Sequence, residues 1–465
     1  MLTRRDFLAS TAAAVPLAAQ QPKPNIIFIL ADDLGYGDLG CYGQTRISTP
    51  NIDRIAREGM RFTQAYAGST VCAPSRCCLM TGLHTGHARV RGNAAANGPR
   101  PPLAPEDATV AEMMQKAGYK TGAFGKWALG EAHTSGRPNL KGFDQFYGYY
   151  NQTHAHSYYP THLWENERYT LIRENRGSQR SGYSHDLIAQ KALDWVDDAA
   201  GSPFFLYLAF TTPHADNELG ADTGDGMPVP DYGEYADKPW PTTEKGFAAM
   251  ITRMDRDIGR LLDLLKKKGV DGDTLILFSS DNGPHQEGGH DPKFFESQGG
   301  LRGIKRDMYE GGVRVPALAR WPGRVKPGVV SKQVWAFWDF FPTACDLAGI
   351  APPAGLDGVS IVPALDGKSL AERPPLYWEF HERNNTAMAA RDGDWKAVRK
   401  SPKAPIELYD LSQDVAERHD VAARNPQVVA KMETSALHSA LRLRRISAAE
   451  RRTVIRKATE FIPSP

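Results

Sequence analysis

Cysteine is scarce in this chain, which has five in 465 residues. An odd number at these spacings does not form a disulfide framework, and no CxxC pair with a matching partner predicts structural zinc. An excess of charge of one sign is also absent, because 56 basic residues stand against 54 acidic ones. This balance gives no global electrostatic case for a nucleic acid or an anionic membrane as partner, so we expect neither.

A long hydrophobic run is absent too. The apolar stretch in MLTRRDFLASTAAAVPLAAQ is too short to span a bilayer, so stable membrane insertion is not expected. It follows paired arginines, Arg4 and Arg5, and its small residues suit a signal-peptidase site. The segment resembles a twin-arginine export signal, the alternative being a chance basic and apolar terminus. Residues 1–21 are therefore predicted to be a signal peptide that uses the twin-arginine machinery, and the mature protein to be periplasmic or secreted.

What the chain does contain is strongly apolar strands alternating with amphipathic helices. Nearly continuous apolar runs at 25–31, 203–211 and 274–280 predict strands that are buried on both faces. Helices between such strands are typical of α/β architecture. A helix is also expected at 335–349, and another beginning at Ser75.

The pattern of apolar and polar residues changes in the last fifth of the chain. From about residue 373, short alternating segments with polar turns predict antiparallel strands, and a charged helix follows at 426–441. We therefore predict a main domain at 22–371 and a smaller α+β subdomain, with an antiparallel sheet, at 372–465.

The predicted buried strands end in residues suited to chemistry. These are Asp32 and Asp33, then His214, then Asp281 and Asn282, with Lys126 at the end of a weaker strand. In open parallel sheets, sites form beyond the carboxyl ends of strands, so these side chains can converge. Adjacent carboxylates repel each other unless a solvated turn or a cation compensates, and oxygen ligands favour Ca²⁺ or Mg²⁺.

The stretch VCAPSRCCLMTG holds the least ordinary cysteine. From the residues alone, Cys72 is a thiol nucleophile, a metal ligand, a buried cysteine or a precursor of another group, whereas Cys77 and Cys78 are interpreted as buried helix residues. Nearby arginine and lysine side chains would neutralise a sulfate- or phosphate-like group, and His214 could protonate a leaving alkoxide. The set predicts hydrolysis of a tetrahedral oxyanion ester. A thiolate suits soft metals, so an unmodified Cys72 fits poorly beside hard-ion ligands.

Several motifs together resemble one family. Cys72–Arg76, CAPSR, resembles the signature of the type I, formylglycine-dependent sulfatases of the alkaline-phosphatase-like superfamily. ADDLGYGDLGCYG, GKWALG, TPH, SSDNG, GGLRGIKRDMYEGGVRVPALARWPG and, near the end, ELYDLSQD resemble the same family in the expected order. The resemblance implies a large mixed, mostly parallel sheet flanked by helices, a small antiparallel sheet near the carboxyl end, and a sulfuric ester hydrolase.

The resemblance also implies a modified nucleophile and a metal. Cys72 would be oxidised to Cα-formylglycine by a formylglycine-generating enzyme, and its hydrate would attack sulfur. A single Ca²⁺ per chain would be held by Asp32, Asp33, Asp281, Asn282 and the modified Cys72.

Further roles carry over to cationic residues. Arg76 would steady the hydrate, Lys126 and Lys305 would hold the sulfate oxygens, and His214 or Lys305 would protonate the leaving alcohol. The second hydroxyl would then lose its proton and expel sulfate, regenerating the aldehyde.

One position departs from the family pattern. GKWALG has Ala128 where many sulfatases have a histidine that is thought to deprotonate the hydrate. His84, His154 and His156 are candidates for that role, and Lys126 is another.

Three stretches resemble the glycan-active branch of the family, namely MTGLHTGHARVRGN, the loop 154–164, and PHQEGGHDPKFF with His285 and His290. Five of the histidines in these stretches, His84, His154, His156, His285 and His290, are predicted to contact substrate. The expected substrate is a sulfated carbohydrate of galactose or N-acetylgalactosamine type, or an aryl sulfate.

Two alternatives stay open at this point. A phosphodiesterase or phosphonate monoester hydrolase on the same fold would use the same cations and metal. A non-enzymatic protein that binds sulfate or glycan is kept open by Ala128.

Overall fold

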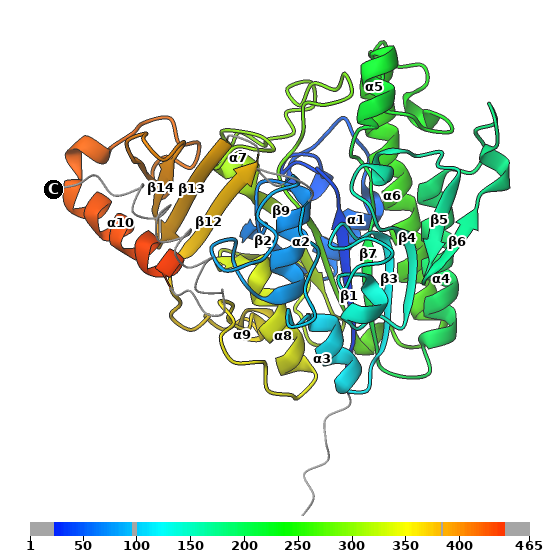
Figure 1. Ribbon diagram of the computed structural model, residues 1–465, viewed down its shortest axis with the longest axis horizontal. Coiled ribbons are helices and arrows are strands. Elements are labelled where there is room, and N and C mark those ends of the chain that lie inside the picture. Colours follow the sequence, from blue (N-terminus) through cyan, green and yellow to red (C-terminus); the bar gives the residue numbers. More distant parts are fainter. Residues whose placement is uncertain (1–22, 95–99, 383–384, 442–465) are drawn as a thin grey trace, which may run out of the picture.

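A computed structural model describes residues 23–94, 100–382 and 385–441, so the predicted signal peptide lies outside the described residues. The described chain forms one large mixed sheet and one small antiparallel sheet, as predicted (Figure 1). No helix in the described ranges is long and apolar enough to cross a membrane.

The large sheet has eleven strands among the described residues, with a parallel centre in the order β8-β1-β7-β3-β4. Strand β9 runs antiparallel between β8 and β2, and the β5–β6 hairpin adds antiparallel strands at the other edge. Its strands are β1 (Asn25–Ala31), β2 (Met60–Tyr66), β3 (Lys120–Lys126), β4 (Gln145–Tyr149), β5 (His162–Glu165), β6 (Arg168–Leu171), β7 (Phe204–Ala209), β8 (Thr274–Ser280), β9 (Arg314–Arg320), β10 (Val329–Ser331) and β11 (Trp335–Ala336).

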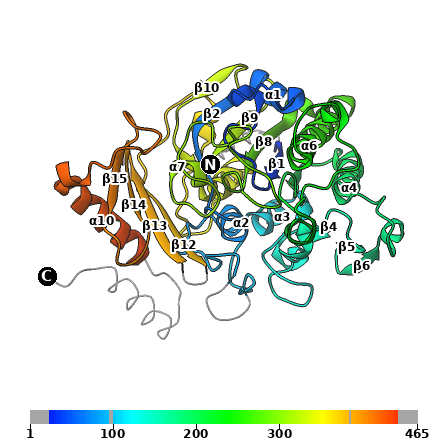
Figure 2. The same ribbon diagram turned by 90° about the horizontal axis from the view of Figure 1, so that it is seen from above.

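Helices cover both faces of this sheet, because side chains of a strand alternate between faces. On β1, Ile27 and Ile29 pack with α1, α4 and α6, whereas Phe28 packs on the other face, with α2, α3 and α8 (Figure 2). The helices are α1 (Pro50–Arg57), α2 (Cys72–Thr81), α3 (Val110–Lys116), α4 (Ser184–Ala199), α5 (Asn217–Thr223), α6 (Thr242–Lys267), α7 (Glu310–Val313), α8 (Phe340–Leu347) and α9 (Val362–Leu365).

The small sheet lies beside the large one and carries the last described helix. It consists of β12 (Leu376–Glu382), β13 (Asn385–Asp392), β14 (Trp395–Arg399) and β15 (Glu407–Asp410), and α10 (Pro426–Leu441) packs on it. Strand β12 contacts the main domain, where the Trp378 indole donates to the Ala67 carbonyl at 2.9 Å. The helix predicted at 426–441 is confirmed, and the domain boundary at 371/372 stays a prediction.

Two element boundaries differ from the predictions. Helix α2 begins at Cys72 and not at Ser75, because the Asn93 side chain accepts the Ala73 N–H at 2.9 Å and so satisfies a free donor of the first turn. The single helix expected at 335–349 is wrong. Asp339 accepts the Ala336 N–H at 2.8 Å and holds a turn there, so α8 begins only at Phe340.

Candidate active site

The carboxyl ends of three parallel strands bring the predicted residues together. Asp32 and Asp33 follow β1, Asp281 and Asn282 follow β8, and Lys126 ends β3. The register of β1 and β8 pairs Ala31 with Ser280, so the two acidic pairs lie side by side. The Asp33 N–H donates to Asp281 Oδ1 at 3.1 Å. All five side chains are buried.

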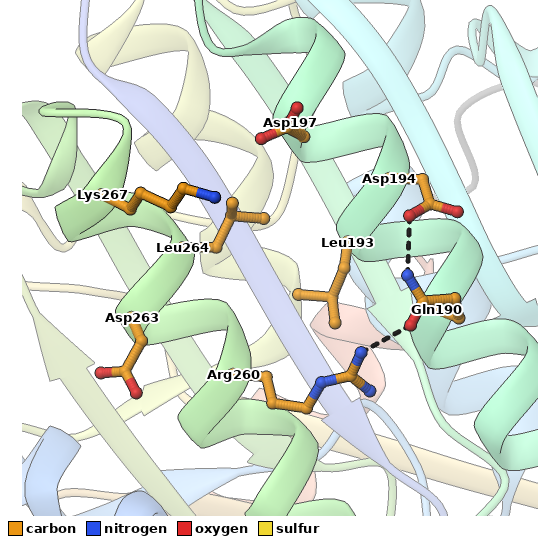
Figure 3. Close-up of a pocket in the computed structure, with 8 residues that line it drawn as sticks. All are labelled: Gln190, Leu193, Asp194, Asp197, Arg260, Asp263, Leu264 and Lys267. Carbon is orange, nitrogen blue, oxygen red and sulfur yellow. Dashed lines mark hydrogen bonds between the residues drawn. The ribbon is translucent and has the colours of Figure 1, made fainter.

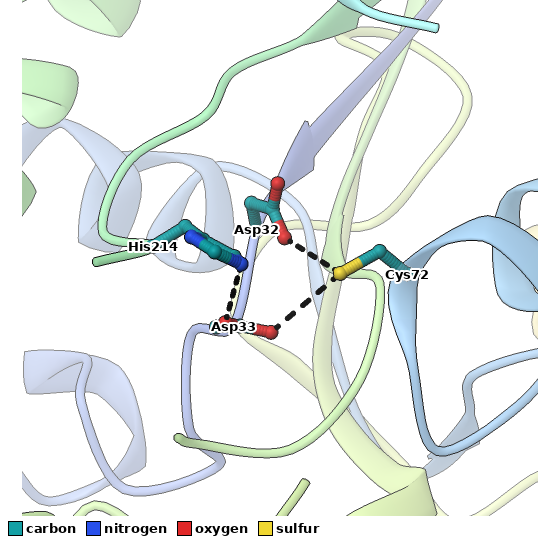
Figure 4. A group of neighbouring side chains, drawn as sticks. All are labelled: Asp32, Asp33, Cys72 and His214. Atoms are coloured by element: carbon teal, nitrogen blue, oxygen red, sulfur yellow. Dashed lines mark hydrogen bonds and ion pairs between the residues drawn. The ribbon is translucent and has the colours of Figure 1, made fainter. Parts of the chain in front are cut away.

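Cys72 faces this acidic group from the first residue of α2 (Figure 4). Its Sγ lies 3.2 Å from Asp32 Oδ1 and 3.9 Å from Asp33 Oδ1, and the residue is 0% exposed. Burial, together with the Asp32 charge, raises the pKa of the Cys72 thiol well above its usual value. The position therefore disfavours a thiolate, which would be the reactive form of an unmodified cysteine.

Arg76 and Lys126 neutralise the carboxylates on the α2 side. The Arg76 guanidinium donates to Asp281 Oδ2 through Nε at 3.0 Å and Nη2 at 2.7 Å, and Nη2 also lies 3.3 Å from Asp32. Lys126 Nζ donates to Asp32 Oδ2 at 2.6 Å. Burial would raise the pKa of Asp32, but Lys126, His214 and Arg76 outweigh it and hold that pKa well below its usual value. The carboxylate is therefore charged.

Lys305 and His214 form a second group of contacts, in which Lys305 is the cation. Lys305 Nζ lies 2.7 Å from Asp33 Oδ2, 2.9 Å from Glu287 Oε2 and 3.2 Å from His214 Nε2. His214 Nδ1 donates to the Ala215 carbonyl at 2.6 Å, so its Nε2 accepts from the Lys305 ammonium. Burial, with the Lys305 charge, lowers the pKa of His214 to about 4.

Glu287 is a site residue that the sequence reasoning missed. Besides Lys305, it accepts from Arg306 at 2.6 Å, and it lies 3.9 Å from His214. It stands inside PHQEGGHDPKFF, so the motif could have pointed to it. A lone glutamate in a loop nevertheless carries no pattern that distinguishes it from a solvated one.

The five predicted histidines occupy different places. The His156 ring stacks on the His214 ring at 4.8 Å between centroids, and its Nδ1 lies 3.0 Å from Glu218. The His285 ring lies 6.1 Å from that of His214, and its Nδ1 accepts the Glu287 N–H at 3.1 Å. These two histidines therefore adjoin the cluster.

The other three histidines contact different groups. His290 is buried against Glu244 at 2.8 Å. His154 stacks on His162 at 4.3 Å. His84 follows the carboxyl end of α2, about 15 Å along the helix from Cys72, and its backbone N–H donates to Asp357 at 3.1 Å.

The predicted metal ligands suit a hard cation. Asp32, Asp33, Cys72 and His214 present potential ligand atoms within 4.8 Å of one another. Asn282 Oδ1 is buried and has no hydrogen-bond partner in the described part of the chain, although Nδ2 of the same side chain donates to Asp33 Oδ1 at 2.6 Å. An unpaired buried carbonyl oxygen beside three carboxylates fits a Ca²⁺ ligand set.

A hollow of about 400 Å³ lies on the flank between α4 and α6 (Figure 3). Leu193 and Leu264 are among its lining residues, and Arg260, which also lines it, donates to Gln190 at 2.5 Å. None of the predicted site residues lines it.

Comparison with known proteins decides the family. A family model described as Sulfatase matches residues 24–350. The chain belongs to the sulfatase family. A second model, described as N-sulphoglucosamine sulphohydrolase, C-terminal, matches residues 303–443 of this sulfatase. The enzyme class predicted from the sequence, a sulfuric ester hydrolase, is thereby confirmed.

Named relatives cover most of the chain. N-acetylgalactosamine-6-sulfatase of Canis lupus familiaris is 33% identical over 84% of this sulfatase and 75% of its own length. N-acetylgalactosamine-6-O-sulfatase of Bacteroides thetaiotaomicron is 30% identical over 88% and 92%. The solved structure of Ps i-CgsB in complex with k-i-k-neocarrahexaose has a TM-score of 0.77 and 29% identity, and covers 94% of this chain and 98% of its own. These matches confirm the predicted alkaline-phosphatase-like fold.

Proposed function

We propose that this sulfatase removes sulfate from a carbohydrate of galactose or N-acetylgalactosamine type, using a formylglycine made from Cys72 and one Ca²⁺. The observation that carries the proposal is the chemistry around Cys72. Three carboxylates and three cations surround a buried thiol whose raised pKa makes it a poor nucleophile. The names of the relatives, and a neocarrahexaose bound to a structural neighbour, support a sugar substrate.

Asp32, Asp33, Asp281 and Asn282 would hold the Ca²⁺ together with the modified Cys72. The unpaired Asn282 Oδ1 supports this assignment. When bound, the ion would offset negative charge on the sulfate and the nucleophile.

Lys126 and Lys305 would bind the sulfate oxygens, and Arg76 would orient the group at position 72. Lys126 has Asp32 as its only hydrogen-bond acceptor within the described ranges, so N–H donors remain for a sulfate. Lys305 instead has three partners, one of them His214 Nε2. The Lys305 ammonium, held by His214 Nε2, would therefore carry the proton that the leaving alkoxide takes.

His156 is our choice for the role of the histidine that Ala128 replaces. Its ring stacks on His214, and Glu218 orients its Nδ1. The His84 ring stacks on His87 and the His154 ring on His162, and neither makes the contact with His214 that favours His156. Burial lowers the pKa of His156 to about 4, so its imidazole is neutral at pH 7 and can accept a proton, but as a weaker base than a solvated histidine.

Two partners act before catalysis in this proposal. A formylglycine-generating enzyme oxidises Cys72, and the twin-arginine machinery exports the protein to the periplasm or beyond. Both follow from the signature at Cys72–Arg76 and the paired arginines of the amino terminus.

Mass spectrometry of the tryptic peptide Phe62–Arg76 tests the proposal. Protein made with a formylglycine-generating enzyme should show the aldehyde at position 72 and should hydrolyse an aryl sulfate much faster than an aryl phosphodiester. Protein made without it should keep the thiol and be inactive. Active protein with only the thiol would overturn the formylglycine mechanism, and a preference for the phosphodiester would favour the alternative hydrolase.

A further inference from the structure

The loop after α2 returns to the amino end of the same helix. It leaves at Gly82, whose carbonyl accepts the Asp357 N–H at 3.0 Å, and it pairs with β12 where the His381 N–H donates to the Arg91 carbonyl at 3.2 Å. It then reaches Asn93, whose side chain accepts the N–H of Ala73. Asn93 therefore lies next to the residue that follows Cys72.

Arg100 is attached to this loop. Its Nη1 donates to the Asn93 carbonyl at 3.2 Å, which brings the guanidinium to the amino end of α2. In the part of the chain that the structure describes, Arg100 makes no ion pair with a carboxylate. A guanidinium has five N–H donors, so most of them remain available.

The Glu131 carboxylate interacts electrostatically with Arg100, but its hydrogen bond is with another residue. Burial lowers the pKa of Arg100, and the negative charge of Glu131 offsets this only in part. Glu131 Oε1 accepts from Asn151 Nδ2 at 2.8 Å and so connects the turn after Ala128 with the loop that carries His156. Arg100 thus remains a half-buried cation beside the first turn of α2, with no carboxylate within ion-pair distance among the described residues.

The cations at the centre of the site are already paired with carboxylates. Arg76, Lys126 and Lys305 each contact a carboxylate of the proposed metal site. Arg100 contacts none of these carboxylates and is held instead at the amino end of α2, through the Asn93 carbonyl. A planar guanidinium fork is suited to a carboxylate or a sulfate, which it binds through two parallel hydrogen bonds.

We propose that Arg100 binds a second anionic group of the substrate, a carboxylate or a further sulfate on the sugar unit next to the one that is desulfated. This inference rests on the proposed function and adds to it a preference for a multiply charged glycan. Arg100 is then a specificity residue that acts on binding and leaves the reacting sulfate to Lys126 and Lys305.

The test compares Arg100→Gln and Arg100→Lys with the wild-type holoenzyme on three substrates. These are a neutral monosulfated sugar, the same sugar joined to a uronic acid, and the same sugar joined to a second sulfated sugar. For Arg100→Gln we expect KM to rise about 10- to 100-fold on the anionic disaccharide that the wild type prefers, with kcat unchanged. On the neutral substrate, kcat/KM of Arg100→Gln should stay within about twofold of the wild-type value. On the anionic disaccharide, the KM of Arg100→Lys should fall between those of the wild type and Arg100→Gln.

The matched control is Arg89→Gln, because Arg89 lies on the same loop but pairs with Glu106 at 2.8 Å and also with Asp107. It should leave all three substrates unaffected. An equal loss on the neutral substrate would overturn the inference, since Arg100 would then serve the reacting sulfate or the fold. An unchanged KM on every substrate would overturn it as well.

A binding measurement separates this inference from the proposed function. Calorimetric titration with the uronic-acid disaccharide that lacks the reacting sulfate needs no turnover. Binding that is lost in Arg100→Gln but kept in Arg89→Gln supports the anion site even if no sulfate ester is hydrolysed. Equal binding by both variants contradicts it even in an active sulfatase.

Discussion

Two buried charge clusters of this sulfatase use the same residue types and differ in how fully their charges are paired. The site cluster holds Asp32, Asp33, Asp281, Arg76, Lys126 and Lys305. The second, which we call the interface cluster, lies between the large and the small sheet and holds Glu310, Glu417, Lys396, Arg314, Arg391 and Tyr66. Both are made of buried carboxylates and cations.

In the interface cluster the partners come from both sheets and meet one another directly. Lys396 Nζ lies 2.9 Å from Glu310 and 3.1 Å from Glu417, and the Tyr66 hydroxyl donates to Glu310 at 2.7 Å. Glu417 Oε1 makes no hydrogen bond among the described residues, but it has Lys396 as its ion-pair partner. The site cluster instead keeps an Asn282 oxygen with neither kind of partner in the described part of the chain, and spare donors on Lys126. A cluster whose members satisfy one another fastens two parts of a protein, whereas one with atoms left over is suited to a ligand.

The largest expected effect removes the proposed nucleophile of the site cluster. Cys72→Ala should reduce turnover of an aryl sulfate at least about 1,000-fold, because the attacking group is removed. Cys77→Ala, in the same buried helix, should keep its activity. Comparable losses in both variants would show that α2 is disturbed and that Cys72 has no special role.

The next effect breaks the interface cluster. Lys396→Met should lower the free energy of unfolding by about 3–5 kcal/mol, because two buried carboxylates lose their shared cation. Denaturant unfolding measures the change. Lys400→Met removes an exposed partner of Glu407 and should cost at most about 1 kcal/mol. A Lys396 variant as stable as the Lys400 variant would contradict the comparison.

Removal of calcium tests the unpaired oxygen. Calcium at about 100 times its Kd should raise the free energy of unfolding by about 2.7 kcal/mol, and a chelator should abolish the gain. In Asn282→Ala the calcium dependence should weaken strongly. Thermal unfolding with and without calcium, with magnesium as control, is the measurement. An equal response of the variant and the wild type would exclude Asn282 as a ligand.

The smallest effect is the pH dependence of the interface cluster. Burial raises the pKa of Glu417 to about 7, whereas Lys396 and neighbouring cations hold that of Glu310 at about 2 against the burial penalty. An unfolded glutamate titrates near about 4.3, so between that pH and about 7 the folded protein binds the extra proton at Glu417 and loses stability as pH rises. Glu310 is ionised in both states there, and its contribution to stability is lost only at lower pH.

Glu417→Gln should therefore resemble the wild type at pH 5 and exceed it in stability at pH 8, by about 1–3 kcal/mol. Denaturant unfolding at the two pH values measures this difference. A difference that does not change with pH would show that Glu417 does not titrate in this range.

The sequence could predict the strands and their ends because both depend on local patterns. Apolar runs identify β1, β7 and β8, and parallel strands deliver Asp32 and Asp281 to one edge. The interface cluster could not be predicted in this way. Glu310 and Lys396 stand 86 residues apart and meet only because β14 packs against α7.

The start of α2 and the charged loop residues of the site could not be predicted from the sequence for a related reason. The start of α2 depends on a side chain 20 residues away, at Asn93. Glu287 and Arg100 lie on irregular segments, where a charged residue is ordinarily solvated and no period marks it. The motifs predicted the residues at the centre of the site, whereas its outer residues could be recognised only in the folded structure.

The complete burial of Cys72 sets an order of events in time. With 0% exposure at the start of α2, beneath Asp32, the thiol is out of reach of any modifying enzyme once the chain has folded. In the proposed mechanism, oxidation at this position must therefore precede folding. A polypeptide that folds first would then stay inactive, so the yield of active protein would depend on whether the maturation enzyme acts before the chain folds.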